Sequence, residues 1–169
     1  MPNTLMVIAP SVFRDEEYAE PKAVLEARGA EVTTASVAPG ECLGKLGMRA
    51  TATMSVAEAV GRDWDAVVFI GGAGARVFFD DPAAHELARR QVDAGRLLAA
   101  ICIAPSTLAR AGLLEGVRAT AFADREDDLR AHGAIWTGDP VTVDGSIITG
   151  NGPEAATLFG ESVASALGI

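Results

Sequence analysis

Short apolar runs that alternate with helix-like segments constrain the fold of this chain more than any other feature. Thr4–Ala9 (TLMVIA), Ala66–Ile70 (AVVFI) and Leu97–Ile101 (LLAAI) are apolar almost throughout and show no solvent-facing side. Strands of this kind are typical of a parallel sheet that helices cover on both faces. We therefore predict an α/β fold, a sandwich of the doubly wound kind with a mostly parallel sheet.

The other segments extend the same pattern. Cys42–Met54 mixes glycine with alternating apolar residues and predicts an irregular β excursion. Near the C-terminus, Asp144-Gly145 separates two short apolar runs, which indicates a hairpin. No linker or repeat divides the chain, so residues 1–169 are expected to form a single domain. A further strand is expected at Glu31–Ala35, and helices at Tyr18–Arg28, Ser55–Val60, Asp81–Ala94, from Ala104 onward and at about Pro153–Leu167.

The charge and the cysteine content restrict where the protein works and what it binds. The net charge of -9 and the pI of about 4.6 disfavour nucleic acid and anionic membranes as partners. No apolar run has the ~20 residues that a membrane span needs, and the first residues lack a signal-peptide pattern. Two cysteines, Cys42 and Cys102, do not make a disulfide framework. We expect a cytoplasmic protein, with Cys42 in a polar loop.

Three loops that follow strands carry the unusual residues. They are Ser11–Glu17 (SVFRDEE), Gly71–Gly74 (GGAG) and the corner at Cys102. Because the C-terminal ends of parallel strands meet at one edge of the sheet, all three loops are expected to open on one crevice.

Cys102 sits between an apolar strand and a helix with almost no loop between them, which resembles a nucleophile elbow. Such a corner predicts a positive φ at Cys102 and a thiolate favoured by the helix N-terminus. The backbone N–H groups of Ile103 and Gly72 would form an oxyanion hole. The alternative is that Cys102 is a small buried hydrophobe, as most free cysteines are.

An acidic cluster precedes the first helix. Glu17 is expected just before that helix, with Pro21 in its first turn, its carboxyl buried and facing the Cys102 sulfur. The alternative is an ordinary carboxylate at a helix start, which the helix dipole favours and which Asp15 and Glu16 fit equally well.

Other motifs give weaker signals. Gly72-Ala73-Gly74 lacks the third glycine of a dinucleotide fingerprint. His85 fits a solvated helix face, and His132 fits a helix end. No spacing of His, Cys and acidic residues predicts a metal site.

Taken together, the motifs resemble the ThiJ/PfpI superfamily across nearly the whole chain. They are an early acid followed by proline, VVFIGGAG, AAICIAP, and Gly152-Pro153 before the last helix. NGPEAA makes the chain most similar to the Parkinson-associated deglycase and chaperone branch. The resemblance implies a single-domain flavodoxin-like sandwich related to class I glutamine amidotransferases.

The resemblance also implies roles for individual residues. Cys102 matches the nucleophile, Glu17 the acid beside it, and Gly72 and Ile103 the oxyanion donors. Arg49 falls where that branch places an arginine near its dimer interface. The resemblance implies a homodimer that needs no cofactor. Candidate substrate-binding residues are Arg49, Gly71, Ala73, Asn151 and Gly152.

The chain departs from the superfamily at two histidines. Ile103 stands where the protease-like branch has a histidine, and the glycine loop lacks the acid that completes its triad. Phe122 aligns with a further histidine of the deglycase-like branch, so a general base is missing there.

Two classes of function therefore stay open. The first is a cysteine-dependent stress-response protein that acts on small reactive carbonyls, such as methylglyoxal, or on glycated protein, as a glyoxalase or deglycase. The second is a redox sensor or chaperone that uses oxidation of Cys102 without turnover. A protease, amidase or hydratase is a third interpretation, for which the crevice residues give no positive sign.

Overall fold

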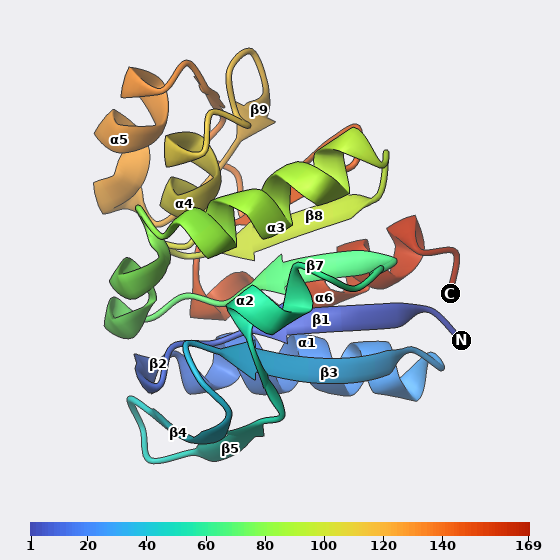
Figure 1. The fold of residues 1–169 in the computed structure, drawn as a ribbon. Coiled ribbons are helices and arrows are strands. Elements are labelled where there is room, and N and C mark those ends of the chain that lie inside the picture. The colour runs from blue at the N-terminus through green and yellow to red at the C-terminus, as the bar shows by residue number, and fades with distance from the viewer.

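A seven-stranded sheet forms the centre of the computed structural model, which describes residues 1–169 (Figure 1). All neighbouring strands are parallel except the antiparallel pair at one edge, β11 and β12. In spatial order the strands are β11 (Val141–Asp144), β12 (Ile147–Gly150), β8 (Leu97–Ile101), β7 (Ala66–Phe69), β1 (Asn3–Val7), β3 (Glu31–Ser36) and β6 (Met54–Ser55).

The order of the five main parallel strands identifies the fold type. From one side to the other they run β3, β1, β7, β8 and β12, which is the 2-1-3-4-5 order of flavodoxin-like folds. The predicted α/β sandwich with a mostly parallel sheet is confirmed. Ligands in such folds bind beyond the C-terminal ends of the strands, where the strand order reverses. Here that point lies between β1 and β7.

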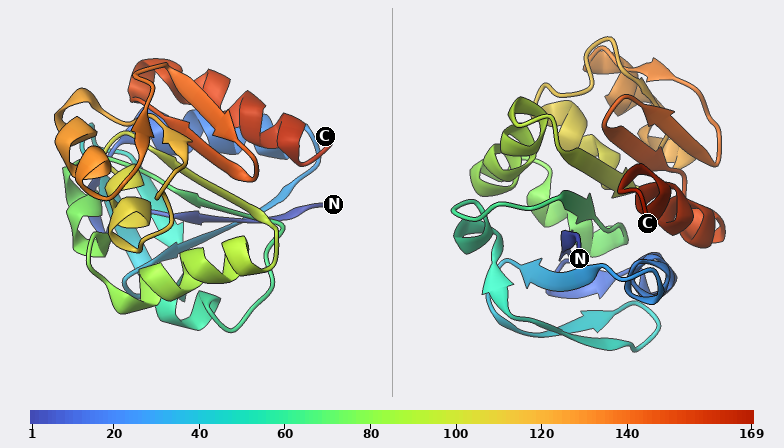
Figure 2. Two further views of the ribbon diagram at one scale, coloured as in Figure 1. Left: turned by 90° about the horizontal axis from the view of Figure 1, so that it is seen from above. Right: turned by 90° about the vertical axis from the view of Figure 1, so that its right-hand side faces the viewer.

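Helices cover both faces of the sheet (Figure 2). On one face lie α1 (Asp15–Ala27) and α6 (Ala156–Ala166), and on the other lie α2 (Val56–Ala59), α3 (Pro82–Asp93) and α4 (Pro105–Arg110). Side-chain caps begin two of these helices: the Ser55 side chain accepts the Glu58 N–H in a capping box, and Asp81 accepts two N–H groups at the start of α3. These helices and the apolar strands enclose one core of 49 buried residues.

The remaining elements are short. They are β2 (Ser11–Phe13), β4 (Gly40–Gly44) and β5 (Arg49–Ala52) in a three-stranded sheet, β9 (Arg118–Ala119) and β10 (Ile135–Trp136) in a pair, α5 (Glu126–Ala131), and the 3-10 helices η1 (Ala73–Phe78), η2 (Ala123–Arg125) and η3 (Pro153–Ala155).

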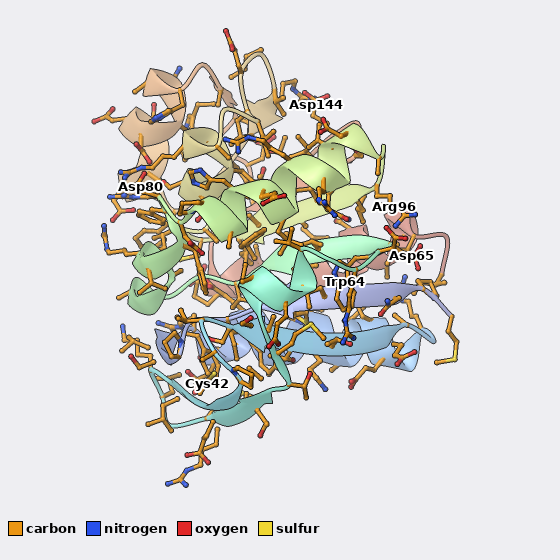
Figure 3. All side chains as sticks on the ribbon, viewed as in Figure 1. Cys42, Trp64, Asp65, Asp80, Arg96 and Asp144 are labelled. Carbon is orange, nitrogen blue, oxygen red and sulfur yellow. The ribbon has the colours of Figure 1, made fainter.

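The predicted β excursion is the β4–β5 hairpin, but its cysteine is not in a polar loop. Cys42 lies on β4 with its side chain buried (Figure 3). The buried carboxylate of Asp15 holds the turn of this hairpin by accepting the N–H groups of Leu46 and Met48. Asp15 therefore has a structural role and is not an ordinary solvated carboxylate at a helix start.

The first helix begins three residues earlier than expected. The structure places Asp15, Glu16 and Glu17 in the first turn of α1 and Pro21 in its interior, so Glu17 does not precede the helix and Pro21 does not start it. The ring of Pro21 is buried where α1 meets Gly160 of α6. This helix–helix contact stabilises a residue that ordinarily ends a helix.

Both chain termini lie at the same edge of the molecule, beyond the N-terminal ends of the parallel strands (Figure 1). The carboxyl ends of the strands point to the opposite edge. No helix is long and apolar enough to span a membrane.

Candidate active site

Cys102 forms the corner between β8 and α4. Its φ is +64°, which confirms the predicted positive φ and is uncommon for a residue other than glycine. Two backbone hydrogen bonds hold this strained residue: its N–H donates to the Gly150 carbonyl (2.9 Å), and its carbonyl accepts the Phe122 N–H (2.8 Å). The corner is therefore fixed from two other loops of the same edge.

The glycines after β7 permit a close approach to this corner. A Cβ on Gly71 would lie 2.5 Å from both the Cys102 Cβ and the Glu17 Oε1, so only glycine fits between the thiol and the acid. Gly72 has φ +99°, and a Cβ there would lie 2.5 Å from the Arg14 nitrogen. The N–H groups of Gly72 and Ile103 are close enough to the sulfur to lower the pKa of Cys102. This is the arrangement that an oxyanion hole requires.

Glu17 reaches the site from the first turn of α1. Its neighbour Tyr18 anchors that turn, because the Tyr18 hydroxyl hydrogen-bonds to the Thr34 hydroxyl (2.7 Å) and the ring packs edge-on against Phe13. The Glu17 side chain is fully buried. As predicted, the Glu17 carboxyl lies close enough to the Cys102 thiol for each group to affect the pKa of the other. Neither carboxyl oxygen, however, makes a hydrogen bond with good geometry. Burying a carboxyl without a well-formed hydrogen bond costs folding free energy. Such a carboxyl keeps its capacity to exchange a proton.

Burial dominates the electrostatics of the pair. It raises the pKa of Glu17 to about 7, although the nearby Cys102 thiol and the Arg14 guanidinium act to lower it. Burial, followed by the negative charge of Glu17, raises the pKa of Cys102 to about 12. The expected acidified thiol is therefore wrong for the resting protein: desolvation outweighs the N–H groups, and α4 has only one and a half turns. The pair retains at least one proton at neutral pH.

Arg14 is a site neighbour that the sequence did not reveal. Its charge interacts with both Glu17 and Cys102, and its side chain donates to Glu16 (2.7 Å). Its backbone N–H donates to the Gly71 carbonyl (2.9 Å), which joins the first loop to the glycine loop. A basic residue in an acidic stretch gives no sign of this in the sequence.

A second strained residue lies in the first loop. Val12 has φ +56°, a genuine outlier for a β-branched side chain, and a Cβ on Gly72 would lie 2.5 Å from the Val12 carbonyl oxygen. Strained backbone is therefore concentrated where these loops meet, as is common at functional sites.

The other predicted site residues fall into two groups. Gly71, Asn151 and Gly152 lie on loops at the carboxyl edge of the sheet, and Ala73 begins η1 at the same edge. Arg49 instead lies on β5, largely exposed and paired with Glu41 (3.5 Å), and is not among the charges that shift the pKa of Cys102. Their substrate-binding roles stay predictions.

The histidines lie elsewhere. His85 hydrogen-bonds to the Phe79 carbonyl, and His132 to the Asp128 carbonyl. Phe122, at the position aligned with a family histidine, is partly exposed beside Cys102. No group of three or more His, Cys, Asp or Glu side chains is placed to hold a metal ion.

Comparison with known proteins identifies the family. The model of the DJ-1/PfpI family matches residues 3–166. The chain belongs to the DJ-1/PfpI family. This confirms the resemblance to the ThiJ/PfpI superfamily read from the motifs around Gly71 and Cys102.

Relatives and solved structures of the DJ-1/PfpI family match over most of their length. MJ0967 of Methanocaldococcus jannaschii is 39% identical over 96% of this chain and 81% of its own. Deglycase PfpI of Pyrococcus furiosus is 31% identical over 88% of this chain and 90% of its own. A ThiJ/PfpI domain protein from Brachyspira murdochii superposes with a TM-score of 0.94 at 33% identity, covering 98% of this chain and 96% of its own. Drosophila melanogaster DJ-1beta superposes with a TM-score of 0.91 at 28% identity, covering 98% and 90%.

Proposed function

We propose that this DJ-1/PfpI protein is a cysteine-dependent enzyme of small reactive carbonyls, of the glyoxalase or deglycase type. The observation that carries the proposal is the strained Cys102, with a buried, unpaired carboxyl on one side and two backbone N–H groups on the other. Four relatives among the archaeal proteins bear the name deglycase at 28–31% identity, which supports the same class of chemistry.

In the proposed reaction the thiol adds to the aldehyde carbon of methylglyoxal. The Glu17 carboxylate accepts the thiol proton as the S–C bond forms, which offsets the high pKa of the resting thiol. The carbonyl oxygen takes the electron pair of its π bond and accepts hydrogen bonds from the Gly72 and Ile103 N–H groups. Protonated Glu17 then returns the proton to this oxygen and completes a hemithioacetal.

The same carboxyl can carry the later proton transfers. It accepts the proton from the carbon that bears sulfur and returns a proton to the neighbouring carbon. The hydroxyl proton of the first carbon passes to the oxygen of the second, so the hemithioacetal becomes a thioester of lactate. Water then cleaves the thioester to lactate and regenerates the thiol. With a pKa of about 7, Glu17 is present in both the acid and the base form near neutral pH, as an acid–base catalyst should be.

Release of lactate from methylglyoxal tests the proposal. We expect release by the wild-type protein and release at the level of buffer by Cys102→Ala, because the nucleophile is gone. Cys42→Ala is the matched control, since Cys42 is buried on β4 and should keep the activity. Equal release by wild type and Cys102→Ala would contradict the proposal.

A redox role is the second candidate, favoured by the absence of an imidazole at Cys102 and by Phe122 in the aligned position. Protonated Glu17 could donate a hydrogen bond to one oxygen of a Cys102 sulfinate. Peptide mass spectrometry after graded peroxide tests this role. It requires two added oxygens on Cys102 at doses that leave Cys42 unmodified, and loss of that product in Glu17→Gln. Equal oxidation of both cysteines would exclude it.

A further inference from the structure

A cavity of about 340 Å³ opens beside the cysteine corner. Its volume falls in the range of ~300–1,000 Å³ that is usual for small-molecule sites. Residues of three chain segments line it, among them Phe122, Trp136, Asn151, Gly152 and Glu154. The reaction proposed above uses none of these side chains.

The backbone joins this cavity to the nucleophile. Phe122, which lines it, donates its N–H to the Cys102 carbonyl (2.8 Å). Gly150, which accepts the Cys102 N–H (2.9 Å), directly precedes the lining residues Asn151 and Gly152. A molecule bound in the cavity is therefore adjacent to the strained corner.

The lining residues define the chemistry of a ligand. Two aromatic side chains, Phe122 and Trp136, are both partly accessible. Two glycines leave these aromatic side chains uncovered. A Cβ on Gly138 would lie 3.3 Å from the Trp136 Nε1, and a Cβ on Gly152 would lie 3.7 Å from the Phe122 ring. None of the nine lining residues is Lys, Arg or His, and Glu154 is acidic. The cavity therefore suits a flat, uncharged group and disfavours an anion.

We propose that this cavity is a subsite for the aromatic group of an uncharged carbonyl compound whose aldehyde carbon reacts with Cys102. The proposal rests on the carbonyl chemistry above and names the preferred substrates: aryl-substituted oxoaldehydes are preferred to methylglyoxal and to anionic oxoaldehydes. Phe122 and Trp136 are specificity-determining residues, and Asn151 supplies a polar group at the rim.

Labelling of Cys102 measures this preference without any turnover. The two probes are benzyl and methyl methanethiosulfonate; in each case the cysteine sulfur displaces methanesulfinate and forms a mixed disulfide. Rates at Cys102, followed by peptide mass spectrometry, are divided by the rates of the same reagents with glutathione. We expect a normalised benzyl-to-methyl ratio of about 5 to 10, the effect of one good aromatic contact.

Three variants test the assignment to these side chains. Phe122→Ala and Trp136→Ala should each bring the ratio toward 1. Ile135→Ala is the matched control, because Ile135 neighbours Trp136 on β10, is exposed, and does not line the cavity. A wild-type ratio of 1, or an equal loss in Ile135→Ala, would overturn the proposal.

Equilibrium binding gives a second measurement if the thiol labels too slowly. Trp64 is buried, so quenching of tryptophan fluorescence by acetophenone should report Trp136. We expect saturable quenching in wild type and in Cys102→Ala, and its loss in Phe122→Ala; quenching that does not saturate in wild type would overturn the subsite. The two proposals can fail separately. Saturable binding without lactate release would contradict only the proposed reaction, and lactate release with a labelling ratio of 1 would contradict only the subsite.

Discussion

The buried carboxyl of Glu17 makes the stability of the protein depend on pH. Below pH ~4.5 the carboxyl is neutral in both the folded and the unfolded chain. Between that pH and about 7 the unfolded chain releases the proton while the folded chain keeps it. The free energy of unfolding therefore falls as pH rises through this window. We expect Glu17→Gln, which cannot ionise, to gain up to ~3 kcal/mol relative to wild type between pH 4.5 and pH 8.

Urea unfolding of wild type and Glu17→Gln at a series of pH values measures this difference. Glu16→Gln is the control on the same turn of α1, because its carboxyl reaches solvent and pairs with Arg14. A constant difference between Glu17→Gln and wild type across the series would show that the carboxyl is not kept protonated by burial.

At the residue scale, the sequence predicts what is encoded locally. The abrupt change from strand to helix at Cys102 predicts its positive φ, and Gly72 predicts a close approach of backbone to that corner. Contacts between distant segments leave no such local signal. Neither the hydrogen bond from Phe122 to Cys102 nor the charge of Arg14 beside Glu17 could be read from the chain. The high pKa of the thiol was missed because burial depends on the whole fold.

Helices α1 and α6 pack closely because Gly160 has no side chain. A Cβ there would lie 2.7 Å from the Pro21 Cα and 3.2 Å from the Pro21 Cβ. Gly160→Ala should therefore overpack the contact and lower the free energy of unfolding by ~1–3 kcal/mol. The same change at Gly61, where a Cβ would meet only the Glu58 carbonyl at 3.7 Å, should have little effect. Chemical denaturation of both variants checks this, and equal stabilities would refute the close-packing argument.

At the scale of elements, the sequence predicts best those strands and helices whose own residues determine them. The apolar runs of β1, β7 and β8 are stable only when buried, and the caps Ser55 and Asp81 mark where α2 and α3 begin. The start of α1 was misplaced because its first turn is acidic and Pro21 normally marks a boundary. Very short elements such as β2, β9 and β10 depend on pairing with distant strands, so their residues alone do not reveal them.

As a whole, the molecule leaves several apolar side chains exposed on adjoining elements. Val12, Leu43, Leu46 and Val77 lie on β2, the β4–β5 hairpin and η1, which contact one another. Exposed apolar surface of this kind suits contact with a second copy, and we keep the prediction of a homodimer. Leu46→Asp should shift the protein to the monomer in analytical ultracentrifugation. Leu158→Asp, on the exposed side of α6, should leave the dimer intact; a wild-type monomer would refute the prediction.

The two termini leave the molecule at the edge opposite the carboxyl end of β8 (Figure 1), which Cys102 directly follows. A tag, a surface anchor or a fused domain attached at either terminus would therefore leave the reactive edge unobstructed. The present chain could thus be immobilised or joined to another module with the edge that carries Cys102 left open.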